Sequence, residues 1–388
     1  MDKDPGSSSL RQLSDIQTPA LLLDLAKLDA NSARLRKHLE AVAPDVLHRP
    51  HLKTAKSIEV AEHVLQGEEP AITVSTLREA EIFARAGFRD ILYAVGITPS
   101  KLARVAALRA QGADLKIITD NLETAEKIAV FAAETGTNLP VLIEIDCDGH
   151  RSGLQPSRPD AIVAVARVLS DGAQLAGVMT HAGGSYDAGN EDEVFAAASG
   201  EVAAIVRSAQ ILREAGFAVP IVSMGSTPTA LSVRDLSGIT EIRAGVYMFF
   251  DLVMAGLGIC HSRDIALSVL TTVIGHQREK GWIIVDAGWM AMSRDRGTAD
   301  QQIDQGYGLV CYPDGQPVGD LIMESANQEH GILAVRPGST RSLPDIPVGS
   351  LLRILPNHAC STAAQHDQYI VLDKAGRVMA QWPRFSGW

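Results

Sequence analysis

Short apolar runs alternate with longer helical patterns over the first two-thirds of the chain, and this alternation constrains the fold more than any other feature. The short runs, such as VLIEI and ILYAV, are apolar at nearly every position, which is typical of parallel strands covered on both faces. Several of the helical patterns end in a glycine at the expected C-cap position. The eight predicted strands are 46–53, 71–75, 90–95, 114–120, 140–146, 175–182, 221–226 and 241–247.

Eight strand–helix units within about 210 residues predict a (β/α)8 barrel. A doubly wound open sheet is the rival fold, but Gly256 and Gly258 lack the third glycine of a dinucleotide-binding turn. After residue 256 the helical periodicity fades, and strand-like runs separated by turn clusters predict a second, mostly β domain. We predict a barrel at 27–255, a β domain built from 17–26 plus 256–388, and a disordered lead at 1–16.

The composition narrows the class of partner. The chain has 35 Lys and Arg against 46 Asp and Glu, a net charge of −11, which argues against nucleic acid. No apolar run approaches the roughly 18–20 residues of a membrane span, and the polar start predicts no signal peptide. The four cysteines form no CxxC pair, which indicates a reducing, cytoplasmic location. Small molecules and metal ions remain as expected partners.

The first predicted strand ends in a lysine. In a (β/α)8 barrel the chemistry lies at the C-terminal ends of the strands. The run Arg49-Pro-His-Leu-Lys53 would place Lys53 in the barrel mouth, where a partly desolvated amine can form a Schiff base. A structural ion pair with a strand-end carboxylate is the alternative. Lys56 is a weaker candidate, because it lies past the strand and opens the next helical pattern.

The seventh predicted strand ends in the run SMGSTPT. Thr227 is a suitable N-cap, Gly225 permits close backbone approach, and Ser226 adds a hydroxyl, so this turn is a candidate anion site. Tyr247, at the end of the eighth strand, is near enough to add contacts. A capped helix without a ligand is the alternative. A Schiff-base lysine together with a phosphate site suggests pyridoxal phosphate.

Three further polar segments stand at candidate positions. Arg151 follows the fifth strand and could hold the phenolic oxygen of the cofactor. His181 and Tyr186 flank a Gly-Gly turn after the sixth strand and could face a planar ring. His358 and Cys360, two residues apart on a predicted extended segment, would face the same way and offer imidazole and thiolate to a metal. A purely structural role is the alternative for each.

These segments together resemble the fold-type III pyridoxal-phosphate enzymes, in the branch of the D-serine dehydratases and D-threonine aldolases, which shares an alanine-racemase-like barrel. The resemblance covers about residue 17 to the end. It is carried by the segments TPALLLDL, RPHLKTAKS, TVSTLREAE, EIDCDGHRSG, THAGGSY, GSTPTA, EIRAGVY, DAGWMAMSRDRG, QEHG and PNHAC.

The resemblance implies a role for each matching residue. Lys53 would carry the cofactor, His358 and Cys360 would bind a divalent metal, and Tyr186 would lie near the pyridine nitrogen. Zinc is the expected metal, with manganese or magnesium as alternatives. The phosphate would be held by Gly225, Ser226 and Thr227 together with Tyr247.

The implied activity is dehydration of D-3-hydroxyamino acids, with 3-hydroxyaspartate converted to oxaloacetate and ammonia as the expected reaction. Aldolases of this branch carry an acidic residue where this chain has Cys360, which favours a dehydratase. The alternatives are an aldolase that releases glycine and an aldehyde, a D-serine dehydratase, and a non-catalytic pyridoxal-phosphate carrier. A homodimer is expected from the resemblance.

Overall fold

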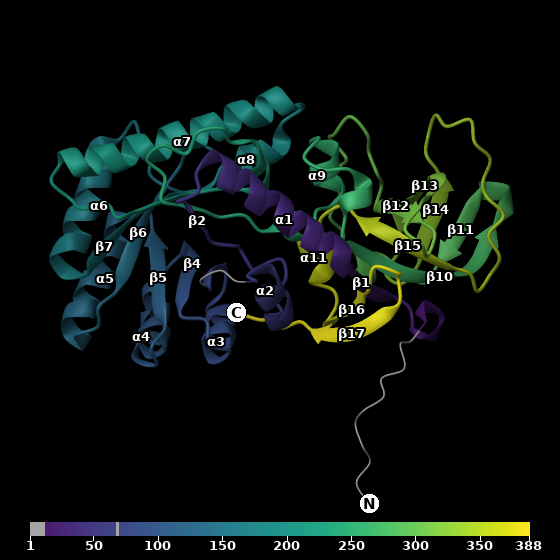
Figure 1. Cartoon of the computed structure of the whole chain (residues 1–388), viewed down its shortest axis with the longest axis horizontal. Coiled ribbons are helices and arrows are strands. Elements are labelled where there is room, and N and C mark those ends of the chain that lie inside the picture. The colour runs from purple at the N-terminus through teal and green to yellow at the C-terminus, as the bar shows by residue number, and fades with distance from the viewer. Residues whose placement is uncertain (1–11, 67–69) are drawn as a thin grey trace, which may run out of the picture. The chain divides into compact units, whose positions relative to one another are not determined.

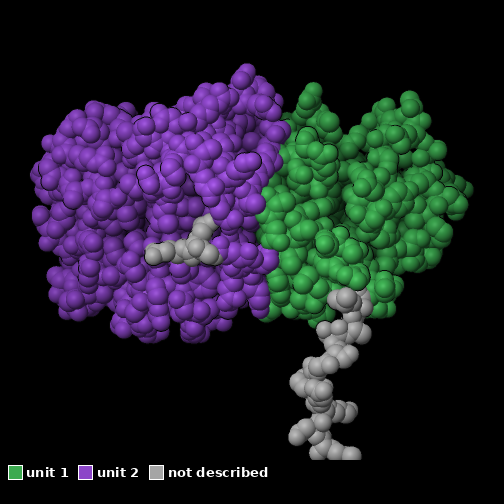
Figure 2. Space-filling view, viewed as in Figure 1, with its two compact units in different colours: residues 1–31, 248–256, 260–384 green, residues 32–247, 257–259, 385–388 purple. Residues whose placement is uncertain are grey.

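The computed structural model describes residues 12–66 and 70–388, and it divides the chain into two compact units (Figure 2). Unit 1 comprises residues 1–31, 248–256 and 260–384, and unit 2 comprises residues 32–247, 257–259 and 385–388. The predicted barrel, 27–255, differs from unit 2 at residues 27–31 and 248–255, which belong to unit 1, and at 257–259 and 385–388, which belong to unit 2.

Unit 2 holds a parallel eight-stranded sheet in the order β2-β9-β8-β7-β6-β5-β4-β3. The strands are β2 (Leu47–His48), β3 (Ala71–Val74), β4 (Asp90–Gly96), β5 (Asp114–Thr119), β6 (Pro140–Ile145), β7 (Gln174–Thr180), β8 (Ile221–Met224) and β9 (Glu241–Ile242). Each coincides with one of the eight predicted runs, and the predicted (β/α)8 class is confirmed.

The sheet closes through the segment that follows β2. The His51 N–H donates to the Ala244 carbonyl on the β9 side, at 2.7 Å. The Leu52 N–H donates to the Thr73 carbonyl on the β3 side, at 2.9 Å. This segment therefore joins the two edges and makes a nearly closed barrel, so that the C-terminal ends of all its strands lie around one mouth.

Helices surround the strands of unit 2 (Figure 1). They are α2 (Ile58–Val64), α3 (Leu77–Arg85), α4 (Leu102–Ala110), α5 (Leu122–Thr135), α6 (Pro159–Gly172), α7 (Glu191–Glu214) and the short α8 (Thr227–Ser232). A further helix, α1 (Leu25–Val42), runs across the boundary between the two units and was not among the predicted patterns.

Helix α7 is, among the described residues, the one helix long and apolar enough to cross a membrane by length and composition alone. Its buried residues recur every third or fourth position, at Val194, Ala198, Glu201, Ile205, Ser208 and Leu212. That spacing makes one helical face, and the helix packs against β7 and β8. Helix α7 therefore has the pattern of a barrel helix with one covered face.

Unit 1 holds a nine-stranded sheet. Its strands are β1 (Ala20–Asp24), β10 (Leu267–Gln277), β11 (Trp282–Val285), β12 (Gly308–Cys311), β13 (Pro317–Ala326), β14 (Gly331–Val335), β15 (Leu351–Pro356), β16 (Gln368–Leu372) and β17 (Val378–Pro383). Strand β10 pairs with both β15 and β11, which closes β10-β15-β12-β13-β14-β11 into a ring. Strands β1, β16 and β17 extend the sheet from the other half of β10, with β1 and β16 parallel.

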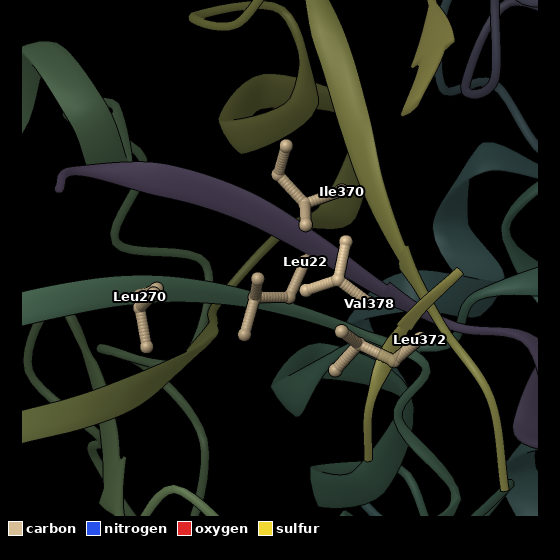
Figure 3. Packing of buried hydrophobic residues seen from close by; sticks show 5 residues of the cluster. All are labelled: Leu22, Leu270, Ile370, Leu372 and Val378. Atoms are coloured by element: carbon tan, nitrogen blue, oxygen red, sulfur yellow. The ribbon is translucent and has the colours of Figure 1, made fainter. Parts of the chain in front are cut away.

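A cluster of buried side chains holds this extension together (Figure 3). Leu13 and Ile16 pack against the cluster, so the predicted disordered lead, 1–16, is structured from residue 12 onward. Residues 1–11 of that lead lie outside the described residues. The cluster consists of Leu22, Leu270, Ile370, Leu372 and Val378.

Replacing Leu22 with alanine is expected to lower the free energy of unfolding by about 2–5 kcal/mol, because Leu22 is fully buried and the site would keep a cavity. Denaturant unfolding followed by tryptophan fluorescence measures the change. Met379→Ala is the matched control, since Met379 lies on β17 of the same sheet but is 44% exposed. Equal transition midpoints for the two variants would contradict this account of the core.

Candidate active site

Lys53 lies in a turn at the barrel mouth and is exposed. The predicted strand 46–53 is therefore too long, since β2 ends at His48. The physical reason is Pro50, which has no N–H to donate and so interrupts the ladder toward β3. The turn follows Leu52, whose N–H donates to the Thr73 carbonyl on the edge of β3. Lys53 thus stands at the strand end, as expected, but outside the strand.

Two histidines beside Lys53 are kept neutral. Burial lowers the pKa of His51 well below its usual value, and the charges of Lys53 and Arg243 add to the effect. Burial also lowers the pKa of His181 to about 3, and Lys53, Arg243 and Arg151 contribute in the same direction. The three cations therefore surround one region of the mouth, which favours anions and disfavours further positive charge.

The hydrogen bond of His181 fixes its tautomer. Its Nδ1 lies 3.0 Å from the Gly225 carbonyl oxygen, which can only accept. Nδ1 therefore carries the proton, and Nε2 keeps a free lone pair. The ring of Tyr186 lies nearby, with 6.3 Å between ring centroids. Tyr186 is in the 3-10 turn η3 (Gly183–Asp187), so both predicted aromatic residues do meet in the loop after β7.

The turn after β8 brings backbone close to backbone. Gly225 has φ +132°, and a Cβ there would lie 2.1 Å from the Arg243 carbonyl oxygen, so the position requires glycine. Ser226, rather than the predicted Thr227, is the N-cap of α8, and its hydroxyl accepts from the Thr229 N–H. Thr227 is the first helical residue, and its hydroxyl accepts the Tyr247 N–H at 3.1 Å.

Several backbone donors remain available in this turn. Within residues 12–66 and 70–388, no acceptor takes the N–H groups of Thr227, Gly245 or Val246. The backbone of Gly245 also lies close to that of His51. A Cβ at position 245 would be only 2.9 Å from the His51 carbonyl oxygen, so the close contact depends on glycine. Unpaired N–H groups beside a glycine are the usual means of binding a phosphate without a lysine. The residues present therefore fit a phosphate-bearing cofactor.

A buried carboxylate that the sequence did not single out joins two of the loops. Glu201 of α7 is 1% exposed and accepts the Ala182 N–H at 3.1 Å and the Gly225 N–H at 2.9 Å. Burial raises the pKa of Glu201, while its hydrogen bonds and Arg243 oppose that shift. The loops after β7 and β8 are thereby fixed to one point on the covering helix.

Arg151 and Tyr247 differ in their surroundings. The Arg151 side chain is 57% exposed, in the loop after β6, and its Nη2 lies 3.7 Å from Glu144. Tyr247 is fully buried in the 3-10 turn η4 (Val246–Met248), with its ring edge-on to His48 at 5.4 Å. The exposed Arg151 can therefore reach a ligand, whereas the buried Tyr247 is tied to the turn after β8 through its backbone N–H.

The predicted metal pair lies in unit 1. The expectation of an extended segment is wrong beyond His358, because β15 ends at Pro356 and the helix α11 (Ala359–Ala363) begins directly afterwards. His358 is the N-cap and Cys360 is the second helical residue. The two side chains are nevertheless close enough for Cys360 to raise the pKa of His358. A nitrogen and a soft sulfur donor at one point fit a borderline metal such as Zn²⁺.

Two aspartates that sequence reasoning missed hold this pair. Asp295 Oδ2 lies 2.7 Å from Nδ1 of His358, and it also accepts from the Ser361 hydroxyl at 3.0 Å. The buried Asp251 accepts the N–H of Ala359, the residue between the two ligands, at 2.9 Å. Because Nδ1 is engaged, Nε2 is the nitrogen left for a metal.

The charges around His358 favour a cation. Burial opposes protonation of the ring, but hydrogen bonds to Asp295 and Cys360 raise the pKa of His358 to about 11. A divalent ion bound at Nε2 would take the place of the proton that the charged His358 ring carries there. No group of three or more histidine, cysteine or acidic side chains able to hold a metal occurs in the described part of the chain. The protein thus offers two ligands and leaves the remaining positions open.

The comparisons with known proteins identify the family of the chain. The model of the alanine racemase N-terminal domain matches residues 23–253, which is more than half of the chain, and a putative serine dehydratase domain matches residues 266–372. The chain belongs to the D-serine dehydratase branch of the alanine-racemase-like enzymes. Within this branch it is 49% identical to D-threo-3-hydroxyaspartate dehydratase of Delftia sp. (strain HT23), over 97% of this chain and 99% of the relative.

Other members of the branch are more distant. D-serine dehydratase of Dictyostelium discoideum is 28% identical over 97% of this chain and 98% of its own length. D-threonine aldolase of an Arthrobacter species is 30% identical over 93% of this chain and 90% of its own length.

The solved structure of the Delftia enzyme superposes with a TM-score of 0.94, at 97% coverage of this chain and 100% of that one.

The neutral state of His181 can be tested directly. With its pKa at about 3, His181 should remain neutral and Nδ1-protonated from pH 8 down to pH 5. Ring ¹⁵N chemical shifts over that range, assigned with a His181→Gln variant, would show it. The usual pKa in the unfolded chain is higher, so this histidine makes the folded state less stable as the pH falls below about 6.5. A titration midpoint near pH 6.5 would contradict the assignment.

Proposed function

We propose that the chain is a pyridoxal-phosphate- and divalent-metal-dependent dehydratase of D-3-hydroxyamino acids. Its proposed reaction converts D-threo-3-hydroxyaspartate to oxaloacetate and ammonia, which makes it a carbon–oxygen lyase. The observation that carries the proposal is the 49% identity to a dehydratase of this specificity over 97% of the chain. The TM-score of 0.94 between the two structures supports it.

The cofactor would be held by the barrel mouth. Lys53 would bind its carbonyl carbon, since Lys53 is exposed at the end of the first strand. The turn of Gly225, Ser226 and Thr227, with Tyr247 behind it, would hold the phosphate through the unpaired N–H groups described above. Pyridoxal phosphate, when bound, supplies an electron sink for the pair left at Cα after deprotonation.

The remaining cofactor contacts are assigned by position. Arg151 would reach the phenolic oxygen, because its guanidinium is mostly exposed near Glu144. Tyr186 would lie near the pyridine nitrogen, and the neutral ring of His181 would face the cofactor ring. In turnover the Nζ of Lys53 would accept the α-proton of the substrate. The positive charges of Arg151 and Arg243 would attract the acidic substrate to the same mouth.

The metal would be held by His358 Nε2 and Cys360 Sγ, with zinc as the proposed ion and manganese or magnesium as alternatives. A divalent metal supplies Lewis acidity, without which hydroxide is a poor leaving group. The pairing of a histidine with a cysteine two positions later has a parallel in the relative. Solved structures of D-threo-3-hydroxyaspartate dehydratase include alanine variants of a histidine and of a cysteine with that spacing, the latter in a metal-free form.

An aldolase is the second candidate, because the branch includes D-threonine aldolase and 3-hydroxy-D-aspartate aldolase. Cys360 argues against it, since the aldolases are expected to carry an acidic residue there. A D-serine dehydratase remains a third candidate. A non-catalytic carrier of the cofactor would have no need of the held His358–Cys360 pair.

We also propose a cytoplasmic homodimer. The location is supported by the four cysteines, none of which forms a disulfide in the described part of the chain. The dimer is proposed from the resemblance to the family.

Product analysis on D-threo-3-hydroxyaspartate tests the proposed reaction. We expect oxaloacetate and ammonia in equal amounts, loss of turnover in the metal-stripped protein, and recovery when zinc or manganese is returned. Coupled malate dehydrogenase and an ammonia assay measure the products, and Lys53→Ala serves as the inactive control. Glycine and glyoxylate as products would indicate the aldolase, and full activity without metal would rule out the metal-assisted reaction.

Asp295→Asn tests the metal site independently of turnover. The amide cannot hold the Nδ1–H of His358 as a carboxylate does, so we expect metal affinity to fall roughly 10- to 100-fold. Competition with a chromogenic chelator measures the affinity of the metal-free protein. Asp320→Asn is the matched control, because Asp320 accepts from Ser339 and makes no contact with His358. Unchanged affinity in Asp295→Asn would assign that residue a purely structural role.

A further inference from the structure

Lys56, the second lysine of the Lys53-Thr-Ala-Lys56 turn, has an unusual backbone. Its φ is +45°, in the left-handed region that residues with a Cβ rarely adopt. Its Nζ lies 3.0 Å from Oε1 of Glu79, and the two side chains are 20% and 0% exposed. Lys56 is therefore held in an ion pair and is not available as the cofactor lysine. Strain of this kind persists only where the surroundings impose it.

Glu79 is itself immobile. Its Oε2 accepts the N–H of Ser75 at 3.0 Å, and its Oε1 accepts from the hydroxyls of Ser75 at 2.9 Å and Thr76 at 3.1 Å. It lies in the first turn of α3, whose N-cap is Thr76. A buried carboxylate with this many donors keeps its place. The ion pair thus fastens Lys56 to the start of a barrel helix.

The Lys53 side chain, by contrast, has nothing to hold it. Its Nζ makes no hydrogen bond or ion pair to any residue in the ranges 12–66 and 70–388. The backbone of its turn therefore sets the point and direction from which the Lys53 side chain extends. That turn is fixed on one side where Leu52 donates to Thr73, and it is closed where the Lys56 N–H donates to the Leu52 carbonyl at 2.8 Å.

We propose that Lys56 and Glu79 are positioning residues for Lys53: their ion pair holds the left-handed backbone at Lys56 and so fixes the turn that presents the Lys53 amine. This inference rests on the proposed role of Lys53 as the residue that binds pyridoxal phosphate. Neither Lys56 nor Glu79 touches the reacting atoms in this scheme. Their effect is on where Nζ stands and how long it stays there.

Lys56→Met keeps the apolar stem of Lys56 and removes the charge. We expect it to weaken binding of pyridoxal phosphate about tenfold and to lower kcat roughly 10- to 100-fold, with KM changed less than about threefold, because a misplaced nucleophile affects reaction more than substrate binding. Lys56→Arg should restore both properties to near the wild-type values. The readouts are the absorbance titration with pyridoxal phosphate, steady-state kinetics, and borohydride trapping followed by peptide mass spectrometry.

Lys116→Met is the matched control. Lys116 is 12% exposed and makes ion pairs with Asp90 and Asp114, which are more exposed than Glu79, at the start of β5, the opposite end of the strands from Lys53. This variant should lose thermal stability without a change in cofactor affinity. Glu79→Gln is the second test variant, and it should reproduce the cofactor defect of Lys56→Met if the latter does not fold.

The outcomes separate this inference from the proposed function. The first outcome is trapping of the cofactor at Lys53 in the wild type, with the same degree of trapping and the same affinity for pyridoxal phosphate in Lys56→Met and Glu79→Gln. That result would overturn the positioning role alone. Absence of trapping at Lys53 in the wild type would overturn the proposed function. A fall in melting temperature of Lys56→Met with unchanged affinity and kcat would also count against positioning, because it would show a structural role only.

Discussion

Closure of the barrel between β9 and β3 is the constraint on which the rest of unit 2 depends. It rests on a single short segment, in which Pro50 removes one donor from the ladder. Arg49 is 2% exposed, and its ion pairs to Glu241 at 2.9 Å and Asp90 at 2.8 Å compensate for the hydrogen bond that Pro50 cannot make. Burial opposes the charge of Arg49, yet the two carboxylates raise its pKa. Without closure the loops after β3 and β4 would lie at the far edge of the sheet from those after β2 and β9.

The charge of the whole chain and the charge of the site have opposite signs. The chain is acidic, at −11, but Lys53, Arg151 and Arg243 gather at the mouth of the barrel. The arrangement is tolerated because buried carboxylates lie just below it: Glu241, Glu201 and Glu144 all oppose the lowering of the pKa of Arg243 by burial. A binding site for anions can therefore exist in an acidic protein when the compensating charges lie beneath it rather than within it.

Much of the architecture could be predicted from the sequence because it follows from periodicity. The eight apolar runs and the amphipathic helices each carry their own signal, and the glycine at 225 was identified by its surrounding turn residues. The predicted element boundaries differ from the structure where a single residue determines the end of a strand or the start of a helix. Pro50 shortened the first strand, Ser226 replaced Thr227 as the cap, and a helix began directly after His358.

The supporting carboxylates could not be found in the same way. Glu201 meets Ala182 and Gly225, and Asp295 meets His358, across long separations in sequence that no local pattern encodes. Helix α1 was missed for a different reason, since its apolar positions are widely spaced among charged residues. Residues that contact the reactants often carry a motif, whereas residues that hold them in place are recognised only once the fold brings them together.

Strand β10 has a consequence for the order in which this protein takes shape. Its first half pairs with β1, and its residue Leu270 stands opposite Ala20, about 250 residues away along the chain. At roughly 5–20 residues per second of synthesis, β1 emerges some 12–50 s before its partner exists. Residues 47–242, which form the sheet of unit 2, are all synthesised within that interval, before residue 270 emerges. The apolar segment LLL at 21–23 therefore lacks its β10 partner while the barrel is being synthesised, and β1 can join its sheet only after residue 270 has been made.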